Sequence, residues 1–299
     1  MLLSDSLSRN PNLASVLAPD AKLEKVAGGF RFVEGPVWDG SGLIFSDIPT
    51  DTLYRFTRPL KEGEMPPVFR RPSGEANGNT RDREGRLLSC EHRNRRVSRT
   101  DKDGRIITLA FAYQNKRLNS PNDIVVKSDG AIYFTDPPYG LPNQTENKEQ
   151  PVNGIYRLSR TGEVTLLVSD FDRPNGIALS PDESRLYIND SNRSHIRVFD
   201  VRPDGTPANG RVFAELKDPN ARGVPDGMKV DRAGNVYCTG AGGVWVVAPN
   251  GQILGRMDTP EVAANVGWGD RDGKTLYITA STSLYRIRTW IGGVPPGRR

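Results

Sequence analysis

The feature that most constrains this chain is a short pattern that recurs six times along it. Each copy has a small polar or acidic residue, an apolar strand, a turn that contains glycine in five of the six copies, and a second strand rich in Tyr, Val, Ile and Phe. The pattern is clearest in NDIVVKSDGAIYFTD (122–136) and DGMKVDRAGNVYCTG (226–240). Successive copies lie roughly 40–50 residues apart, which is the period of a β-propeller blade of about four strands. The repeat therefore predicts an all-β, six-bladed β-propeller.

The same repeat sets the expected domain boundaries. A chain of 299 residues has the length of two average domains, but the pattern runs through nearly all of it and so favours one. We expect an N-terminal extension over residues 1–24, the propeller over 25–290 and a C-terminal tail over 291–299. Residues 1–20 of this extension are interpreted either as a short helix that braces the closure of the ring or as a disordered tail.

The turn glycine aligns five of the copies, and the position eight residues before it holds an oxygen-bearing side chain in each of them. In the fourth copy, which has one extra turn residue, the equivalent position is Asn175. Radial repetition puts equivalent residues of every blade around one central channel. The six positions are Glu34, Asn77, Asn122, Asn175, Asp226 and Asn265. A ring of carboxylate and amide oxygens at the channel mouth favours a hard cation such as Ca²⁺, Mg²⁺ or Mn²⁺.

A purely structural interpretation of these residues competes with the metal site. Asn and Asp before a strand often do no more than form Asx turns. That role does not explain Glu34, because Glu is a poor turn former with a longer side chain. The metal interpretation is therefore favoured.

Charge and composition exclude several other kinds of partner. The net charge of +5 could suggest nucleic acid, and the densest basic run is Arg93, Asn94, Arg95, Arg96. Most basic residues have an acidic neighbour, so we interpret this run as a solvated rim and expect no nucleic-acid partner. No apolar stretch approaches the about 18 residues of a membrane span, so no membrane partner is expected. The first residues lack a basic segment followed by an apolar one, which favours the cytoplasm.

Six motifs, in order along the chain, carry a resemblance to a known family. They are EGPVW (34–38), SPNDIVV (120–126), FTDPPYG (134–140), RPNGIALSPD (173–182), VPDGMKVD (224–231) and TLYITASTSLYRIR (275–288). With them, the chain resembles the senescence-marker-protein/gluconolactonase family, the regucalcin-like lactonases, from about Lys25 to Arg288. The segment CEHRNRRVSR (90–99) is most similar to the bacterial sugar-lactone hydrolases.

The resemblance implies a hydrolase that depends on a divalent metal and opens sugar lactones such as glucono-1,5-lactone to the hydroxy acid. It implies one metal ion held by Glu34, Asn175 and Asp226, with Ca²⁺ favoured over Mg²⁺, Mn²⁺ or Zn²⁺. Asn122 would contact the substrate or complete the coordination. Some family members have Arg where this chain has Ser120, so a substrate contact borrowed from those members does not carry over.

The general base is expected to be Asp226, because a ligand carboxylate lies within reach of a water activated by the metal. His92 is the competing assignment, since the ordinary pKa of histidine suits proton transfer. Further substrate contacts are expected from Asn77, His92, Tyr139 and Asn265. The polar insertion over residues 140–153 is interpreted as either a surface lid or a long blade loop.

Two alternative functions stay open at this point. One is a metal-dependent phosphotriesterase or other esterase, and the second is a non-catalytic propeller that binds calcium or a sugar. For the lactonase, the expected partner is a small sugar lactone, and the expected assembly is a monomer or a weak homodimer.

Overall fold

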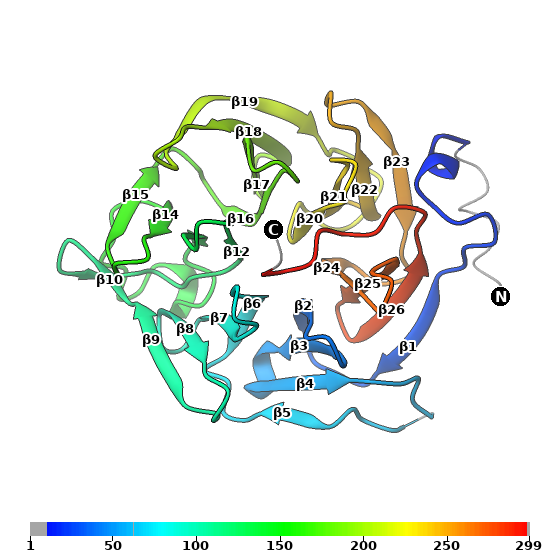
Figure 1. Cartoon of the computed structure of the whole chain (residues 1–299), viewed down its shortest axis with the longest axis horizontal. Coiled ribbons are helices and arrows are strands. Elements are labelled where there is room, and N and C mark those ends of the chain that lie inside the picture. The colour runs from blue at the N-terminus through cyan, green and yellow to red at the C-terminus, as the bar shows by residue number, and fades with distance from the viewer. Residues whose placement is uncertain (1–10, 62, 298–299) are drawn as a thin grey trace.

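The computed structural model describes residues 11–61 and 63–297 of the chain. Its main feature is a ring of six four-stranded antiparallel sheets around a central axis (Figure 1). The six-bladed β-propeller predicted from the repeat is therefore confirmed. Residues 1–10 and 298–299, which belong to the predicted extension and tail, lie outside the described part.

Five of the sheets are built from strands that follow one another in the chain. The first two sheets are β2 (Val33–Trp38), β3 (Leu43–Asp47), β4 (Thr52–Phe56) and β5 (Val68–Arg70), then β6 (Ala76–Arg81), β7 (Leu87–Glu91), β8 (Arg96–Thr100) and β9 (Ile106–Ala110). The third is β12 (Ile124–Val126), β13 (Ile132–Asp136), β14 (Gly154–Leu158) and β15 (Val164–Val168). The next two are β16 (Pro174–Leu179), β17 (Arg185–Asp190), β18 (His195–Val201) and β19 (Pro207–Glu215), then β20 (Met228–Val230), β21 (Val236–Gly240), β22 (Gly243–Val247) and β23 (Ile253–Asp258).

The sixth sheet closes the ring by joining the two ends of the chain. It contains β24 (Ala263–Gly269), β25 (Thr275–Ala280) and β26 (Ser283–Arg288), and its outer strand is β1 (Glu24–Gly28). Before β1, the short 3₁₀ helix η1 (Pro11–Ser15) leads into Val16 and Leu17, which are buried in the same core cluster as Trp268. The described part of the extension therefore packs against the ring.

The core lies between neighbouring blades, and the second strand of each blade is almost wholly buried. These strands read as short runs such as IYFTD and VYCTG, in which every residue is buried. A fully buried tyrosine recurs at the same place in four of them, namely Tyr133, Tyr187, Tyr237 and Tyr277. Strands covered on both faces need apolar side chains at successive positions, which explains why the pattern does not alternate strictly.

Neighbouring blades approach most closely at a glycine that follows the ring position. The N–H of Gly78 donates to the carbonyl of Asn122 at 2.8 Å, and that of Gly176 donates to the carbonyl of Asp226 at 2.9 Å. A Cβ on either glycine would lie 2.4 Å from the accepting oxygen. The absence of a side chain therefore allows the contact that sets the ring position of the next blade.

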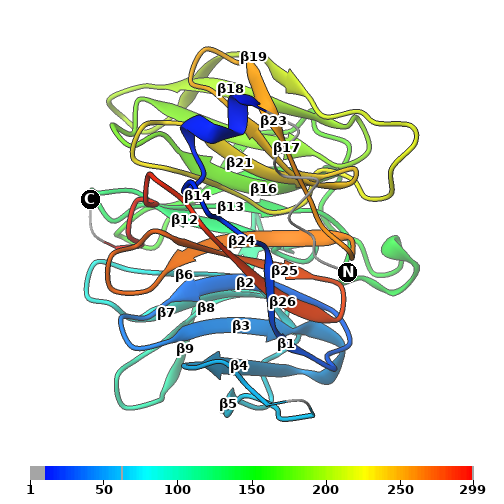
Figure 2. The ribbon, with the colours of Figure 1, turned by 90° about the vertical axis from the view of Figure 1, so that its right-hand side faces the viewer.

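Different segments of the chain lie at the two faces of the ring. The connection between β13 and β14, which contains the 3₁₀ turn η3 (Pro142–Gln144), projects from one face, whereas the C-terminal segment lies at the opposite one (Figure 2). That segment crosses toward the central axis and is held by Arg232, whose backbone N–H and Nε donate to the carbonyls of Gly292 and Gly293. The described residues contain no helix long and apolar enough to cross a bilayer.

Candidate functional site

The six ring residues converge at one mouth of the channel, at or just before the first strand of each blade. Glu34, Asn77, Asn175 and Asn265 lie within β2, β6, β16 and β24, while Asn122 and Asp226 precede β12 and β20 by two residues. All are buried except Asp226, which is partly exposed. The channel mouth therefore gathers side chains from the whole length of the chain.

The central pair in this ring is formed by the carboxyl groups of Glu34 and Asp226. One oxygen of Glu34, Oε2, accepts hydrogen bonds from the backbone N–H of Gly35 at 2.6 Å and from Nδ2 of Asn265 at 2.8 Å. Burial raises the pKa of Glu34 to about 7. Burial and then the neighbouring Glu34 carboxylate raise the pKa of Asp226 well above its usual range. Both groups are costly to ionise without a nearby positive charge.

Asn175 adds an amide to this pair and is held in a fixed orientation. Its Nδ2 bonds to Oγ of Ser191 at 3.2 Å, and that hydroxyl donates to the carbonyl of Pro225 at 2.6 Å. Because Ser191 engages the amide nitrogen, the amide oxygen of Asn175 is available as a ligand. The same hydroxyl ties Asn175 to the segment that carries Asp226.

The chemistry of these donors fits a hard divalent cation. Within the described ranges, no cluster of three or more His, Cys, Asp or Glu side chains has the arrangement of a metal site. A cation at the mouth would therefore be held by two carboxylates together with the Asn175 amide, an all-oxygen set suited to Ca²⁺, Mg²⁺ or Mn²⁺. A divalent charge there would also offset the repulsion between Glu34 and Asp226.

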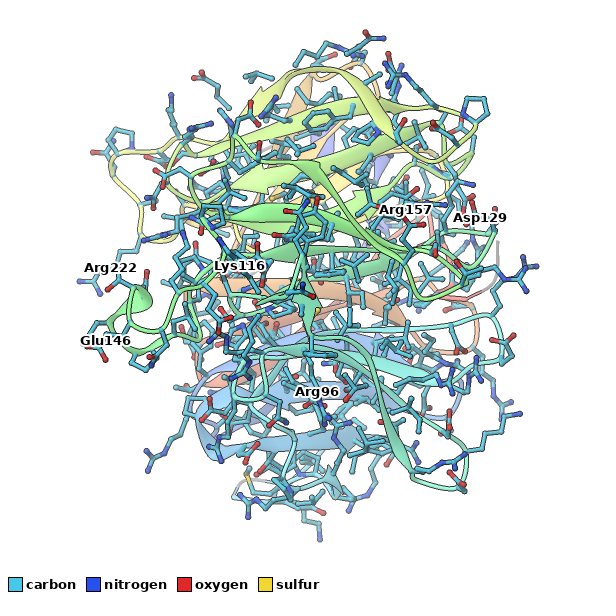
Figure 3. The ribbon with its side chains drawn as sticks, turned by 90° about the vertical axis from the view of Figure 1, so that its left-hand side faces the viewer. Arg96, Lys116, Asp129, Glu146, Arg157 and Arg222 are labelled. Atoms are coloured by element: carbon cyan, nitrogen blue, oxygen red, sulfur yellow. The ribbon has the colours of Figure 1, made fainter. Side chains whose placement is uncertain are left out.

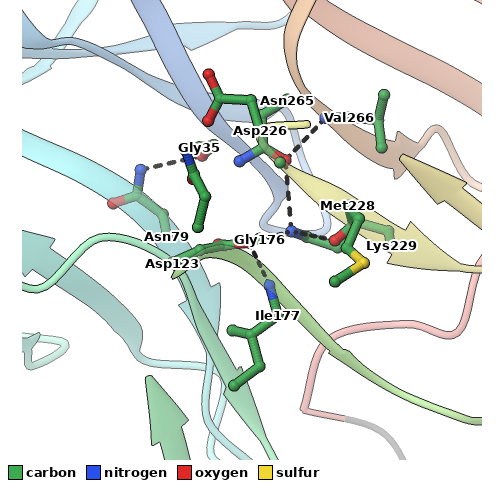
Figure 4. A network of polar contacts seen from close by, with 12 residues as sticks. Gly35, Asn79, Asp123, Gly176, Ile177, Asp226, Met228, Lys229, Asn265 and Val266 are labelled. Atoms are coloured by element: carbon green, nitrogen blue, oxygen red, sulfur yellow. Dashed lines mark hydrogen bonds and ion pairs between the residues drawn. The ribbon is translucent and has the colours of Figure 1, made fainter. Parts of the chain in front are cut away.

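Below the mouth, an ion pair crosses the channel (Figure 4). Nζ of Lys229 lies 3.4 Å from Oδ2 of Asp123 and 3.5 Å from Oδ1 of Asn265. The same Asp123 oxygen accepts the N–H of Ile177 at 3.3 Å. Sequence reasoning missed this pair. The sequence did contain one indication of it. The residue after the ring position is glycine in other blades, such as Gly78 and Gly176, but in the third blade it is Asp123.

His92 stands at one side of the mouth. Its Nε2 lies 3.3 Å from Nδ2 of Asn77, which places both predicted residues together. Burial lowers the pKa of His92 to about 4, so the ring is neutral at pH 7. Gly140 covers it closely, since a Cβ on Gly140 would lie 2.5 Å from that of His92.

Tyr139 reaches the mouth from the connection that follows β13. Burial raises its pKa to about 12, while the side chains of Ser191 and Asn175 and the charge of Asp226 also act on its hydroxyl. The hydroxyl therefore stays protonated and can donate a hydrogen bond beside the carboxyl pair. Sequence reasoning did not select Ser191, since a serine that ends a strand carries no distinctive signal.

Asn122 and Asn265 occupy different environments. The backbone N–H of Asn122 donates to the carbonyl of Thr135 at 2.9 Å, and its carbonyl accepts the N–H of Gly78, which fixes the residue at the mouth. The side chain of Asn265 donates to Glu34 and accepts from the N–H of Val266 at 2.8 Å. Asn265 therefore orients the Glu34 carboxylate.

Comparison with known families and proteins gives a consistent result. The sequence model of the SMP-30/Gluconolactonase/LRE-like region matches residues 32–282. The chain is 34% identical to a gluconolactonase of Zymomonas mobilis over 94% of this chain and 85% of that protein. It is 28% identical to the pentonolactonase XacC of Haloferax volcanii over 84% of this chain and 82% of that protein.

A solved structure agrees with these relatives. A gluconolactonase of Xanthomonas campestris superposes with a TM-score of 0.84 at 36% identity, covering 93% of each chain. The similarity thus extends over the whole propeller rather than over single blades.

Proposed function

Because the chain belongs to the SMP-30/gluconolactonase/LRE-like family, we propose that it is a hydrolase that opens sugar lactones at the channel mouth and requires one divalent metal ion. The gluconolactonase and pentonolactonase relatives, which match over most of their length, support the lactone-hydrolysing activity. The observation that carries the metal requirement is the carboxyl pair formed by the buried Glu34 and the partly exposed Asp226 beside the Asn175 amide.

Glu34, Asn175 and Asp226 would hold the ion, with Ca²⁺ favoured by the all-oxygen donor set. When bound, a divalent ion polarises an ester carbonyl and lowers the pKa of water. The protein contributes a rigid frame for these groups. Glu34 is fixed by Gly35 and Asn265, and Asn175 is fixed by Ser191.

Asp226 is the proposed general base. It is partly exposed at the mouth, whereas its neighbour Glu34 is only 2% exposed. As a ligand carboxylate, Asp226 would lie within reach of a water beside the ion and could take a proton from that water as it attacks. His92 is disfavoured, because it is buried against Asn77 and its pKa is lowered to about 4.

The groups around the pair suit a polyhydroxylated substrate. The protonated hydroxyl of Tyr139 and the amides of Asn77 and Asn122 supply donors and acceptors at the rim, with His92 on the same side. A lactone held by its hydroxyl groups would present its carbonyl to the carboxyl pair. The predicted setting is a cytoplasmic monomer or weak homodimer.

The test is the rate of proton release from glucono-1,5-lactone, measured above the spontaneous rate. Protein stripped with chelator should be inactive, and added Ca²⁺, Mg²⁺ or Mn²⁺ should restore turnover. Paraoxon, assayed in parallel, probes the phosphotriesterase alternative. Lactone hydrolysis that is equally fast with and without chelator would contradict the metal requirement, and no hydrolysis by metal-loaded protein would contradict the lactonase itself.

A further inference from the structure

A recess of about 350 Å³ opens beside the channel mouth, next to His92. Its walls come from the turn after β7 and from the connection that carries η3, which projects from the mouth face in Figure 3. The polar and charged residues that line it are Glu75, His92, Arg93, Arg95, Arg117 and Asn147. His92 joins the two sites, because it lines the recess while its Nε2 contacts Asn77 of the ring.

The arginines of the recess are not all neutralised. Arg93 is paired with Glu75 at 2.6 Å and with Asp51 at 3.1 Å. Arg95 is paired with Glu149 at 3.5 Å, and the charge of the buried Asp136 also acts on it. The other oxygen of the Glu149 carboxylate accepts the backbone N–H of Arg117, and the Arg117 guanidinium donates to the carbonyl of Asn94. Among the residues that the structure describes, the Arg117 guanidinium therefore has no ion pair with an acidic side chain.

Arg95 is the most distinctive of these residues, because it is buried with only 6% of its surface exposed. This differs from the solvated rim expected from the sequence. Its Nε donates to the carbonyls of Leu118 at 2.7 Å and Asn119 at 3.0 Å, and its Nη1 donates to that of Asn147 at 2.9 Å. These bonds fix the side chain without cancelling its charge.

The remaining nitrogen of the Arg95 guanidinium, Nη2, is buried and has no hydrogen-bond partner among residues 11–61 and 63–297. Burial and the nearby Arg117 charge lower the pKa of Arg95, so the two cations destabilise each other. Buried charged donors are ordinarily paired, and an arginine fork matches an oxyanion in both charge and shape.

We propose that this recess is a subsite for an anionic substituent, such as a phosphate, on the end of the lactone remote from its carbonyl. The proposal rests on the proposed function, since it assumes that the lactone carbonyl lies at the carboxyl pair. The substrate would extend past His92, and its oxyanion would accept hydrogen bonds from Arg95 and Arg117. The recess then sets which lactones the enzyme prefers.

The test compares 6-phospho-glucono-1,5-lactone with glucono-1,5-lactone in metal-loaded protein. We expect kcat/KM to be higher for the phosphorylated lactone. The ratio of the two values should fall about tenfold or more in Arg117→Met and in Arg95→Met, as expected for loss of a charged hydrogen bond. Arg117 is exposed, so its variant should fold even if Arg95→Met does not. The control is Arg105→Met, which removes an exposed charge outside the recess and should leave the ratio unchanged.

A second measurement separates this proposal from the proposed function. Calorimetric titration with 6-phosphogluconate and with gluconate detects the subsite without turnover. Tighter binding of the phosphorylated acid that is lost in Arg117→Met supports the subsite even if no lactone is hydrolysed. An unchanged kcat/KM ratio in Arg117→Met, or equal binding of the two acids by the unmodified protein, would overturn it.

Discussion

At the scale of single residues, the chemistry of this protein depends on two acids whose pKa values are raised by burial and by neighbouring carboxylates. Glu34 and Asp226 come from the first and fifth blades and meet beside Asn175. Ionising both carboxyls costs free energy, because Glu34 is buried and the two negative charges repel each other. A bound cation offsets that cost. The stability of the folded protein is therefore expected to depend on the metal.

Glu34→Gln should separate the cost of the buried Glu34 carboxylate from the stabilisation that a bound cation provides. In chelator-treated protein at pH 8 the variant should melt at a higher temperature than the unmodified protein, because it removes a buried carboxylate whose pKa is raised to about 7. Added Ca²⁺ should raise the melting temperature of the unmodified protein but not that of Glu34→Gln, and lactone turnover should fall at least about a thousandfold. A variant that melts lower without metal and is still stabilised by Ca²⁺ would contradict this account.

His92 should make stability depend on pH. Because its pKa is lowered from 6.5 to about 4 in the folded protein, the unfolded chain binds a proton that the folded chain rejects between these values. Its contribution to stability is complete above pH 6.5 and is lost as the pH falls toward 4. Denaturant unfolding from pH 7 to 4.5 should show a loss about 2–3 kcal/mol larger than in His92→Gln. Equal losses in both proteins would show that His92 titrates normally.

Sequence reasoning found the ring residues because the blades repeat. Counting from the turn glycine places Glu34 and Asp226 correctly at the mouth, since equivalent positions in a propeller face one axis. The ion pair between Asp123 and Lys229 could not be found this way. Its partners are 106 residues apart and belong to positions that are not equivalent, so only the side-chain directions bring them together.

The buried state of Arg95 was also missed. A run of basic residues without periodicity suggests solvent exposure, and most of its members are at least partly exposed. Arg95 is buried because carbonyls of distant segments, those of Leu118, Asn119 and Asn147, surround its guanidinium. These acceptors are backbone carbonyls, which every residue has. The sequence therefore does not indicate which of them will surround the Arg95 guanidinium.

At the scale of structural elements, the close contact between the first and second blades depends on a glycine. Gly35 has a φ of +54° and lies so close to the next blade that a Cβ would be 2.1 Å from the carbonyl oxygen of Asn77. Gly162 also has a positive φ, +89°, but a Cβ added there would meet no atom within 4 Å. The two glycines thus differ in crowding, whereas both have a positive φ at which a residue with a Cβ is strained.

Gly35→Ala should therefore destabilise the protein much more than Gly162→Ala. The strained backbone costs about 1–2 kcal/mol in each variant. Gly35→Ala should cost roughly 3 kcal/mol more, because the first and second blades must move apart. It should also weaken Ca²⁺ binding, since Gly35 donates to Glu34. Denaturant unfolding and calcium titration measure both effects. Similar destabilisation in the two variants would show that the blade contact is not limiting.

At the scale of the whole molecule, the ring is closed by β1 pairing with β26. This strand covers the outer edge of the sixth sheet, where Leu284 and Tyr285 are buried. Because the first and last elements share one sheet, the blades are held in a closed ring, and the metal ligands from different blades keep their mutual positions.

Removal of residues 1–28 should open the ring. We expect the melting temperature to fall by more than about 10 °C, because a strand and its buried side chains are lost. Lys25→Ala is the matched control: its side chain is 54% exposed and contacts Glu261 at 3.7 Å, so it should change the melting temperature little. A truncated chain that melts like the full chain would mean that β1 does not close the ring.

The central claim is that side chains from three blades hold one divalent ion at the channel mouth. Calorimetric titration of chelator-stripped protein with Ca²⁺, alongside Asp226→Asn and the remote control Asp103→Asn, tests it most directly. We predict one ion per chain in the unmodified protein and in Asp103→Asn, and no measurable binding in Asp226→Asn. Unchanged binding in Asp226→Asn, or an unmodified protein that takes up none of Ca²⁺, Mg²⁺, Mn²⁺ and Zn²⁺, would contradict it.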